Sequence, residues 1–268
     1  IAIDRSFDDS RLNGKKWKNI RQDTTLARAF WDYVIPVEFM NLSEETTFIK
    51  DVFDRLNRNS RRLVEQELRH AKYDGWFITF VEREAELPDW EKIGVVTTAR
   101  VRRMSDVQFL SELLIVLLKG TVGGFDQEEI DNYYALYENP SETVENFDED
   151  AIRHDFGLAK EYLMRLEEDN NTVTRYSKDA TNLYSLWSII ALNLSSLPDV
   201  TSFARKYRLF MDEVNKYKSK DFMASVLDQK EAPVYSNSLN YYRNSIGART
   251  EGPQREERHS ILMPIIFS

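Results

Sequence analysis

Hydrophobic positions recur at helical spacing along most of the chain. Five apolar residues in the middle of the chain lie three or four positions apart: Met104, Val107, Leu110, Leu114 and Leu117. Residues at this spacing share one face of an α-helix. Gly120 follows them, and glycine favours a helix end because it readily adopts the left-handed conformation. The pattern predicts a helix that ends near Gly120, and its broad apolar face indicates burial on more than one side.

The second half of the chain shows two further apolar stripes. The first consists of Leu183, Leu186, Trp187, Ile190, Ala191 and Leu194. The second follows Pro198 and consists of Phe203, Tyr207, Phe210, Met211, Val214 and Tyr217. A short connection between two helices favours antiparallel neighbours in a bundle, and we expect these aromatic residues in the core rather than in a base-stacking surface. The segment 243–267 joins basic residues to an apolar tail and predicts a terminal helix that covers the core.

Only the beginning of the chain suggests extended structure. Ile1–Ile3 and the apolar residues around Pro36 read as short strands, and proline restricts the second to a sheet edge. A helical stripe follows Ser43 and consists of Phe48, Val52, Phe53 and Leu56. We therefore predict a mainly α chain, in which the remnant of a small α+β domain precedes a helical bundle.

Charge and composition indicate a cellular compartment and a boundary between domains. The net charge is −9, but residues 126–150 hold ten acidic and no basic side chains, so the remaining residues carry about +1. We interpret 126–150 as an acidic linker with helix starts between the domains 1–125 and 151–268. Cysteine is absent and the longest apolar run, 113–118, is too short to span a bilayer. These features predict a cytoplasmic protein with no membrane partner.

Several kinds of catalytic site find little support in the sequence. The phosphate-loop motif G-x-x-x-x-G-K-[ST] does not occur, and the three histidines are scattered, so we predict no metal site. Asp199, Asp228 and Lys230 fit the loose spacing of metal-dependent nucleases, in which carboxylates hold a metal ion and the lysine assists a water molecule. That pattern is short, and an acidic helix cap explains Asp199 as well.

The most informative stretch is 52–77, VFDRLNRNSRRLVEQELRHAKYDGWF. Glu65, Arg69 and Lys72 lie at helical spacing, as do Gln66, Arg69 and His70, so one helix presents a mixed polar face. Arginine suits planar recognition of phosphate or carboxylate. The pattern alone fits a salt-bridged solvent face as well as a binding site.

A resemblance adds to this pattern. The arrangement F-x-R-L-N, followed by L-x-x-Q-E-x-R-x-A-x-Y-x-G-x-F, spans Phe53 to Asn57 and Leu63 to Phe77. It resembles the signature of the ParB-like family that forms the N-terminal domain of GmrSD-type restriction endonucleases. The resemblance covers roughly the first third of the chain. It implies that 1–125 is a portion of a ParB-like domain with its signature helix.

The family implies a bacterial restriction or anti-phage defence protein that binds a nucleotide, hydrolyses it in intact relatives, and is linked to DNA recognition or cleavage. A divalent metal ion with the nucleotide, and a nuclease subunit or domain as partner, follow from the same resemblance. The positions that match the motif and that we expect in the polar pocket are Arg55, Asn57, Gln66, Glu67 and Arg69. The surface positions that we expect to contact phosphate or DNA are Arg58, Arg61 and Arg62.

The sequence departs from the family in two ways. The upstream D-G-x-Q-R motif and the downstream H-N-H-like nuclease region do not occur, so no catalytic residue is assigned. We expect that the chain begins after the missing motif; the alternative is a degenerate member that binds without turnover. The other functions left open are a noncatalytic helical module that docks protein or DNA and, third, the metal-dependent nuclease.

Overall fold

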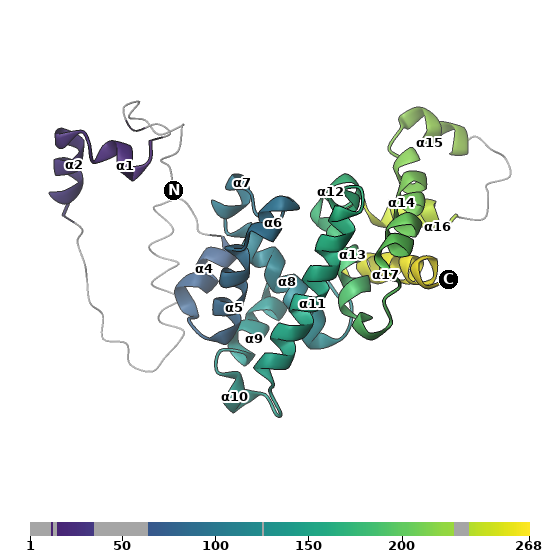
Figure 1. The fold of residues 1–268 in the computed structure, drawn as a ribbon, viewed down its shortest axis with the longest axis horizontal. Coiled ribbons are helices and arrows are strands. Elements are labelled where there is room, and N and C mark those ends of the chain that lie inside the picture. Colours follow the sequence, from purple (N-terminus) through teal and green to yellow (C-terminus); the bar gives the residue numbers. More distant parts are fainter. Residues whose placement is uncertain (1–11, 13–14, 35–63, 125, 228–235) are drawn as a thin grey trace. The chain divides into compact units, whose positions relative to one another are not determined.

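The computed structural model describes residue 12 and residues 15–34, 64–124, 126–227 and 236–268 (Figure 1). The chain divides into two compact units, Ile1–Arg61 and Arg62–Ser268. The described residues form helices and no strand, which confirms the prediction of a mainly α chain. The expected ParB-like α+β remnant stays a prediction, because Ile1–Ile3 and the segment around Pro36 lie outside the described residues.

The described part of the first unit contains two short helices, α1 (Trp17–Ile20) and α2 (Thr24–Trp31). Asp23 precedes α2, and its Oδ1 accepts hydrogen bonds from the backbone N–H groups of Thr25 at 3.0 Å and Leu26 at 3.1 Å. These bonds satisfy donors that a helix start leaves open, so Asp23 fixes where α2 begins. The predicted stripe from Phe48 to Leu56 lies outside the described residues.

The second unit begins with seven described helices, of which α8 is the central one. They are α4 (Glu65–Lys72), α5 (Trp76–Ala85), α6 (Pro88–Lys92), α7 (Thr98–Val101), α8 (Ser105–Lys119), α9 (Gln127–Leu136) and α10 (Pro140–Thr143). α8 packs against α5 on one side and against α13 and α11 on others. Gly120 ends α8 with a φ of 69°, as the sequence predicts, because this left-handed conformation suits glycine.

The second unit continues with helices that enclose one buried helix, α13. The elements are α11 (Glu149–Glu168), α12 (Thr172–Tyr176), α13 (Ala180–Ala191), a 3-10 turn η1 (Leu194–Ser196), α14 (Val200–Lys216), α15 (Lys220–Leu227), α16 (Asn237–Asn244) and α17 (Gly252–Phe267). The residues of α13 from Thr181 to Ala191 are all buried, because α8, α11 and α17 pack around the helix. α14 packs mainly against α11, α16 and α17 rather than against α13, its expected antiparallel neighbour. The predicted terminal helix over 243–267 is found as α17 from Gly252 only, because residues 245–251 form the connection from α16.

The acidic run contributes helix starts within the second unit. Asp126 accepts from Glu129 N at 2.7 Å and begins α9, and Asp148 accepts from Ala151 N at 2.9 Å and begins α11. The run also carries α9 and α10, and the chain divides into its two compact units after Arg61. The predicted domains 1–125 and 151–268 with an acidic linker stay a prediction. None of the described helices has the length and apolar character needed to cross a membrane.

Candidate functional site

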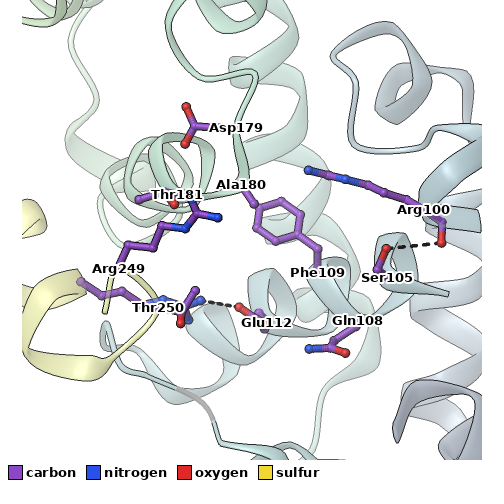
Figure 2. A pocket seen from close by; sticks show the side chains of 11 residues that line it. Arg100, Ser105, Gln108, Phe109, Glu112, Asp179, Ala180, Thr181, Arg249 and Thr250 are labelled. Atoms are coloured by element: carbon purple, nitrogen blue, oxygen red, sulfur yellow. Dashed lines mark hydrogen bonds and ion pairs between the residues drawn. The ribbon is translucent and has the colours of Figure 1, made fainter. Parts of the chain in front are cut away.

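A pocket of about 360 Å³ lies in the second unit where three parts of the chain converge (Figure 2). The first part is α7 with α8, the second is the start of α13, and the third is the connection from α16 into α17. The described lining residues are Arg100, Ser105, Gln108, Phe109, Glu112, Asp179, Ala180, Thr181, Arg249, Thr250 and Arg255. Three arginines and two carboxylates thus line the pocket, in a chain whose net charge is −9. Pockets of this size suit small ligands.

Arg255 and Glu112 form the buried ion pair of the pocket. Arg255 Nη2 lies 2.6 Å from Glu112 Oε2, and the two side chains are 5% and 12% exposed. Arg255 also donates from Nη1 to the carbonyl oxygen of Gly123 at 3.2 Å, and its guanidinium carbon lies 3.8 Å from the centre of the Tyr184 ring. Such a planar cation, held by a carboxylate and an aromatic face, keeps a fixed orientation.

Close backbone packing brings α17 to this position. A Cβ atom on Gly124 would lie 2.3 Å from the backbone nitrogen of Gly252, at the start of α17. Only glycine permits that approach. Tyr184 anchors the same corner, since its hydroxyl donates to the carbonyl oxygen of Gly123 at 2.9 Å. Burial raises the pKa of Tyr184 to about 12, so the hydroxyl keeps its proton at neutral pH.

Arg100 and Phe109 form the opposite wall. Arg100 Nη1 donates to the carbonyl oxygen of Val95 at 3.2 Å, and its guanidinium carbon lies 5.9 Å from the centre of the Phe109 ring. Ser105 donates from Oγ to the carbonyl oxygen of Arg100 at 3.3 Å. In Figure 2 the side chains of Arg100 and Arg249 extend from opposite sides toward the region around Phe109. The wall combines an apolar ring with cationic and hydroxyl groups.

The exposed rim carries Arg249, Thr250 and Asp179. Asp179 is the cap of α13, since its Oδ1 accepts from Asn182 N and its Oδ2 from Asn182 Nδ2, both at 2.9 Å. The carboxylate is therefore oriented toward the helix end rather than toward a cation. Arg249 lies in the connection between α16 and α17, where solvent reaches its guanidinium. The rim thus presents the Arg249 cation with the Thr250 hydroxyl beside it.

The signature helix is α4, and two of its predicted site residues face the protein interior. Gln66 is fully buried and donates from Nε2 to the Tyr134 hydroxyl at 2.7 Å, and that hydroxyl also contacts Ser111 Oγ at 2.8 Å. Arg69 is 2% exposed and donates from Nε to Asp131 Oδ1 at 2.6 Å. This network joins α4 to α8 and α9, and none of its residues lines the pocket.

Glu67 accepts the backbone N–H of Val64 through Oε2 at 2.8 Å, a contact that fixes the start of α4. Gly75 of the same motif is required for a steric reason. A Cβ on Gly75 would lie 2.1 Å from the carbonyl oxygen of Glu138, so the start of α5 packs directly on the end of α9. These motif residues therefore have packing roles within the second unit.

The remaining predicted site residues lie outside the described residues: Arg55, Asn57, Arg58, Arg61 and Arg62, together with Asp228 and Lys230 of the nuclease pattern. Asp199 is the cap of α14 and accepts from Ser202 N at 2.9 Å. Across the described ranges, no group of three or more His, Asp and Glu side chains is arranged to hold a metal ion.

The pocket could hardly be predicted from the sequence. Its lining comes from three segments separated by more than 60 residues each, and no short motif joins them. The basic residues of 243–267 were the one signal, since Arg249 and Arg255 belong to that segment.

Comparisons of the chain with protein-family models, with curated proteins and with solved structures found no match.

Proposed function

We propose that the chain is the ligand-binding part of a bacterial restriction or anti-phage defence protein, and that its arginine-lined pocket binds a small phosphate-bearing ligand. The observation that carries the binding proposal is the convergence of Arg100, Arg249 and Arg255 from separate segments of an acidic chain. The defence role rests on the resemblance of 53–77 to the ParB-like family. That resemblance makes a nucleotide the first ligand to test, with a divalent metal ion beside it and a nuclease subunit as partner.

The chemistry of the lining supports an anion over a neutral ligand. Arginine forms bidentate, charge-assisted hydrogen bonds with phosphate, which are about twice as strong as neutral ones. Thr181 and Thr250 add hydroxyl donors, and Phe109 offers an apolar surface for a ring. Glu112 already pairs with Arg255, so the rim guanidinium of Arg249 is the first contact for an incoming phosphate. The pocket is proposed to bind a ligand. Nucleotide hydrolysis and DNA cleavage are implied only by the family resemblance.

Calorimetric titration of the chain with ATP, GTP and AMP tests the binding proposal, with adenosine as the uncharged control. We expect phosphate-bearing ligands to bind and adenosine to bind more weakly. Arg249→Gln should weaken ATP binding by about tenfold, the effect of losing about 1.4 kcal/mol of interaction. Arg205→Gln is the matched control, because Arg205 is an exposed arginine of α14 outside the pocket lining. Equal affinities for all ligands, or equal losses in both variants, would contradict the proposal.

The internal contacts of Gln66 and Arg69 favour a second candidate, a noncatalytic helical module that docks DNA or protein. In that case Arg58, Arg61 and Arg62 would contact phosphates, and DNA affinity would fall steeply as salt concentration rises. Measuring DNA binding by fluorescence anisotropy between about 50 and 200 mM salt separates the candidates. Absent or salt-independent DNA binding would remove this candidate and leave the pocket proposal standing.

A further inference from the structure

Arg258 of α17 is a fully buried cation close to the pocket. Its Nε donates to Ser185 Oγ at 2.9 Å, and its Nη1 donates to the carbonyl oxygen of Asn244. Its Nη2 is buried without a hydrogen-bond partner. No described carboxylate lies within ion-pair distance of this guanidinium. A buried charge without a partner is unfavourable for folding, so its presence calls for another explanation.

The position of Arg258 relates it to the pocket on two helices at once. Arg255, which lines the pocket, precedes Arg258 by three residues on α17. Thr181, which also lines the pocket, precedes Ser185 by four residues on α13. Three or four residues make one helical turn, with a pitch of 5.4 Å. Arg258 therefore lies about one turn beneath the part of the pocket that Thr181 and Arg255 line.

The groups around Arg258 leave its charge largely uncompensated. The ionisable groups that interact with it are Tyr241, Arg255, Tyr184 and Asp179. Burial raises the pKa of both tyrosines, so they are neutral at pH 7. Arg255 adds a like charge that Glu112 neutralises, and Asp179 is exposed at the rim. Because a protein interior screens charge less than water does, the field of Arg258 extends into the pocket.

We propose that Arg258 is a positioning residue that makes the pocket selective for anionic ligands, by holding an unpaired positive charge one helical turn beneath it. This inference rests on the proposed function, because it presupposes that the pocket binds a phosphate-bearing ligand. Arg258 makes no contact with the ligand. Its effect is electrostatic, so it scales with ligand charge and is greater for ATP than for AMP.

The inference can be tested by placing a carboxylate beside the buried guanidinium, so that Arg258 itself is kept. Ser185→Asp puts an acidic group next to Arg258 Nε and should pair with it, whereas Ser185→Asn supplies a neutral side chain of the same size. We expect S185D to weaken ATP binding about tenfold, to weaken AMP binding less, and to leave adenosine binding unchanged. S185N should bind all three ligands as the unmodified chain does.

Substitution of Arg258 itself gives a second test. Arg258→Met removes the charge and should weaken ATP binding in the same order, ATP more than AMP, while Arg258→Lys keeps the charge and should retain most of the affinity. Equal ATP affinity in S185D and S185N, or a loss that is the same for adenosine as for ATP, would overturn the role of Arg258 and leave the proposed function intact. If the unmodified chain binds none of the nucleotides, the proposed function fails and this inference falls with it.

Discussion

Arg69 of α4 and Asp131 of α9 form an ion pair of unequal burial, in which Arg69 Nε lies 2.6 Å from Asp131 Oδ1. The side chain of Arg69 is 2% exposed and that of Asp131 is 43% exposed. Arg69 also donates from Nη2 to Gln127, to its Oε1 at 2.8 Å and to its carbonyl oxygen at 3.0 Å. One arginine thus joins the signature helix to the start of α9, which is a structural role for a residue that the family resemblance places in a ligand pocket.

Replacing Arg69 separates these two roles. We expect Arg69→Met to lower the free energy of unfolding by about 2–3 kcal/mol, because the buried Gln66 loses the hydrogen bond that Arg69 Nη1 donates to its Oε1 at 3.3 Å, and Gln127 loses two partly buried ones. Arg83→Met, a change at an exposed position of α5, should have little effect. Chemical denaturation measures both. If R69M instead leaves stability unchanged and abolishes ATP binding, the pocket assigned from the family motif is correct and the structural role is wrong.

Tyr134 is the centre of the same network, since its hydroxyl contacts both Gln66 Nε2 and Ser111 Oγ. Tyr134→Phe should lower the free energy of unfolding by about 1–3 kcal/mol, because the buried amide of Gln66 is left without its partner. Tyr133→Phe is the control, since Tyr133 is partly exposed. Its ring stacks on that of Tyr137, and this ring contact does not depend on the Tyr133 hydroxyl. Equal destabilisation of the two variants in denaturant titrations would contradict the network.

The helices with a clear apolar stripe could be predicted from the sequence, because the spacing of apolar residues is a local pattern. The stripe from Met104 to Leu117 and the stop at Gly120 gave α8 nearly to the residue. The direction of Gln66 and Arg69 could not be predicted, because a polar helix face reads the same whether it meets water or a buried partner. Tyr134 and Asp131, which decide the matter, lie more than 60 residues away in sequence.

The pocket could not be predicted from the sequence for the same reason. Glu112 and Arg255 are separated by 143 residues, and their pairing depends on the approach of Gly124 to Gly252. A sequence pattern records neighbours along one helix, whereas this site depends on how three segments cross. Arg249 could be noticed as a basic residue, but nothing local assigned it to a cavity with Phe109.

Substitution of two glycines tests the close packing at the start of α5, with Gly157 of α11 as the comparison. Gly75→Ala should lower the free energy of unfolding by about 1–3 kcal/mol, because the new Cβ would overlap the carbonyl oxygen of Glu138. Gly157→Ala should instead raise it by about 0.5–1 kcal/mol, since Gly157 is within α11 and a Cβ there meets no atom within 4 Å. Thermal unfolding followed by circular dichroism measures both. Shifts of the same sign would contradict the steric account of Gly75.

His259 gives the fold a defined pH dependence. It lies on α17 with Nδ1 3.0 Å from Ser188 Oγ, and burial lowers its pKa below the ordinary value of 6.5. The folded state therefore resists protonation at His259 more than the unfolded state does. Its contribution to stability is complete above pH 6.5 and is lost as the pH falls through the lowered folded pKa.

Comparison of two histidine variants isolates this contribution from that of the carboxylates. The loss in free energy of unfolding between pH 7.5 and pH 5.5 should be smaller for His259→Gln than for the unmodified chain, by up to about 1.4 kcal/mol for each unit by which the pKa is lowered. His154→Gln is the control, because it makes the same substitution at an exposed histidine of α11. Urea denaturation at the two pH values supplies the measurement. An identical pH dependence in the two variants would mean that protonation of His259 costs the folded state nothing, and that the α13–α17 contact admits a charged imidazole beside Ser188.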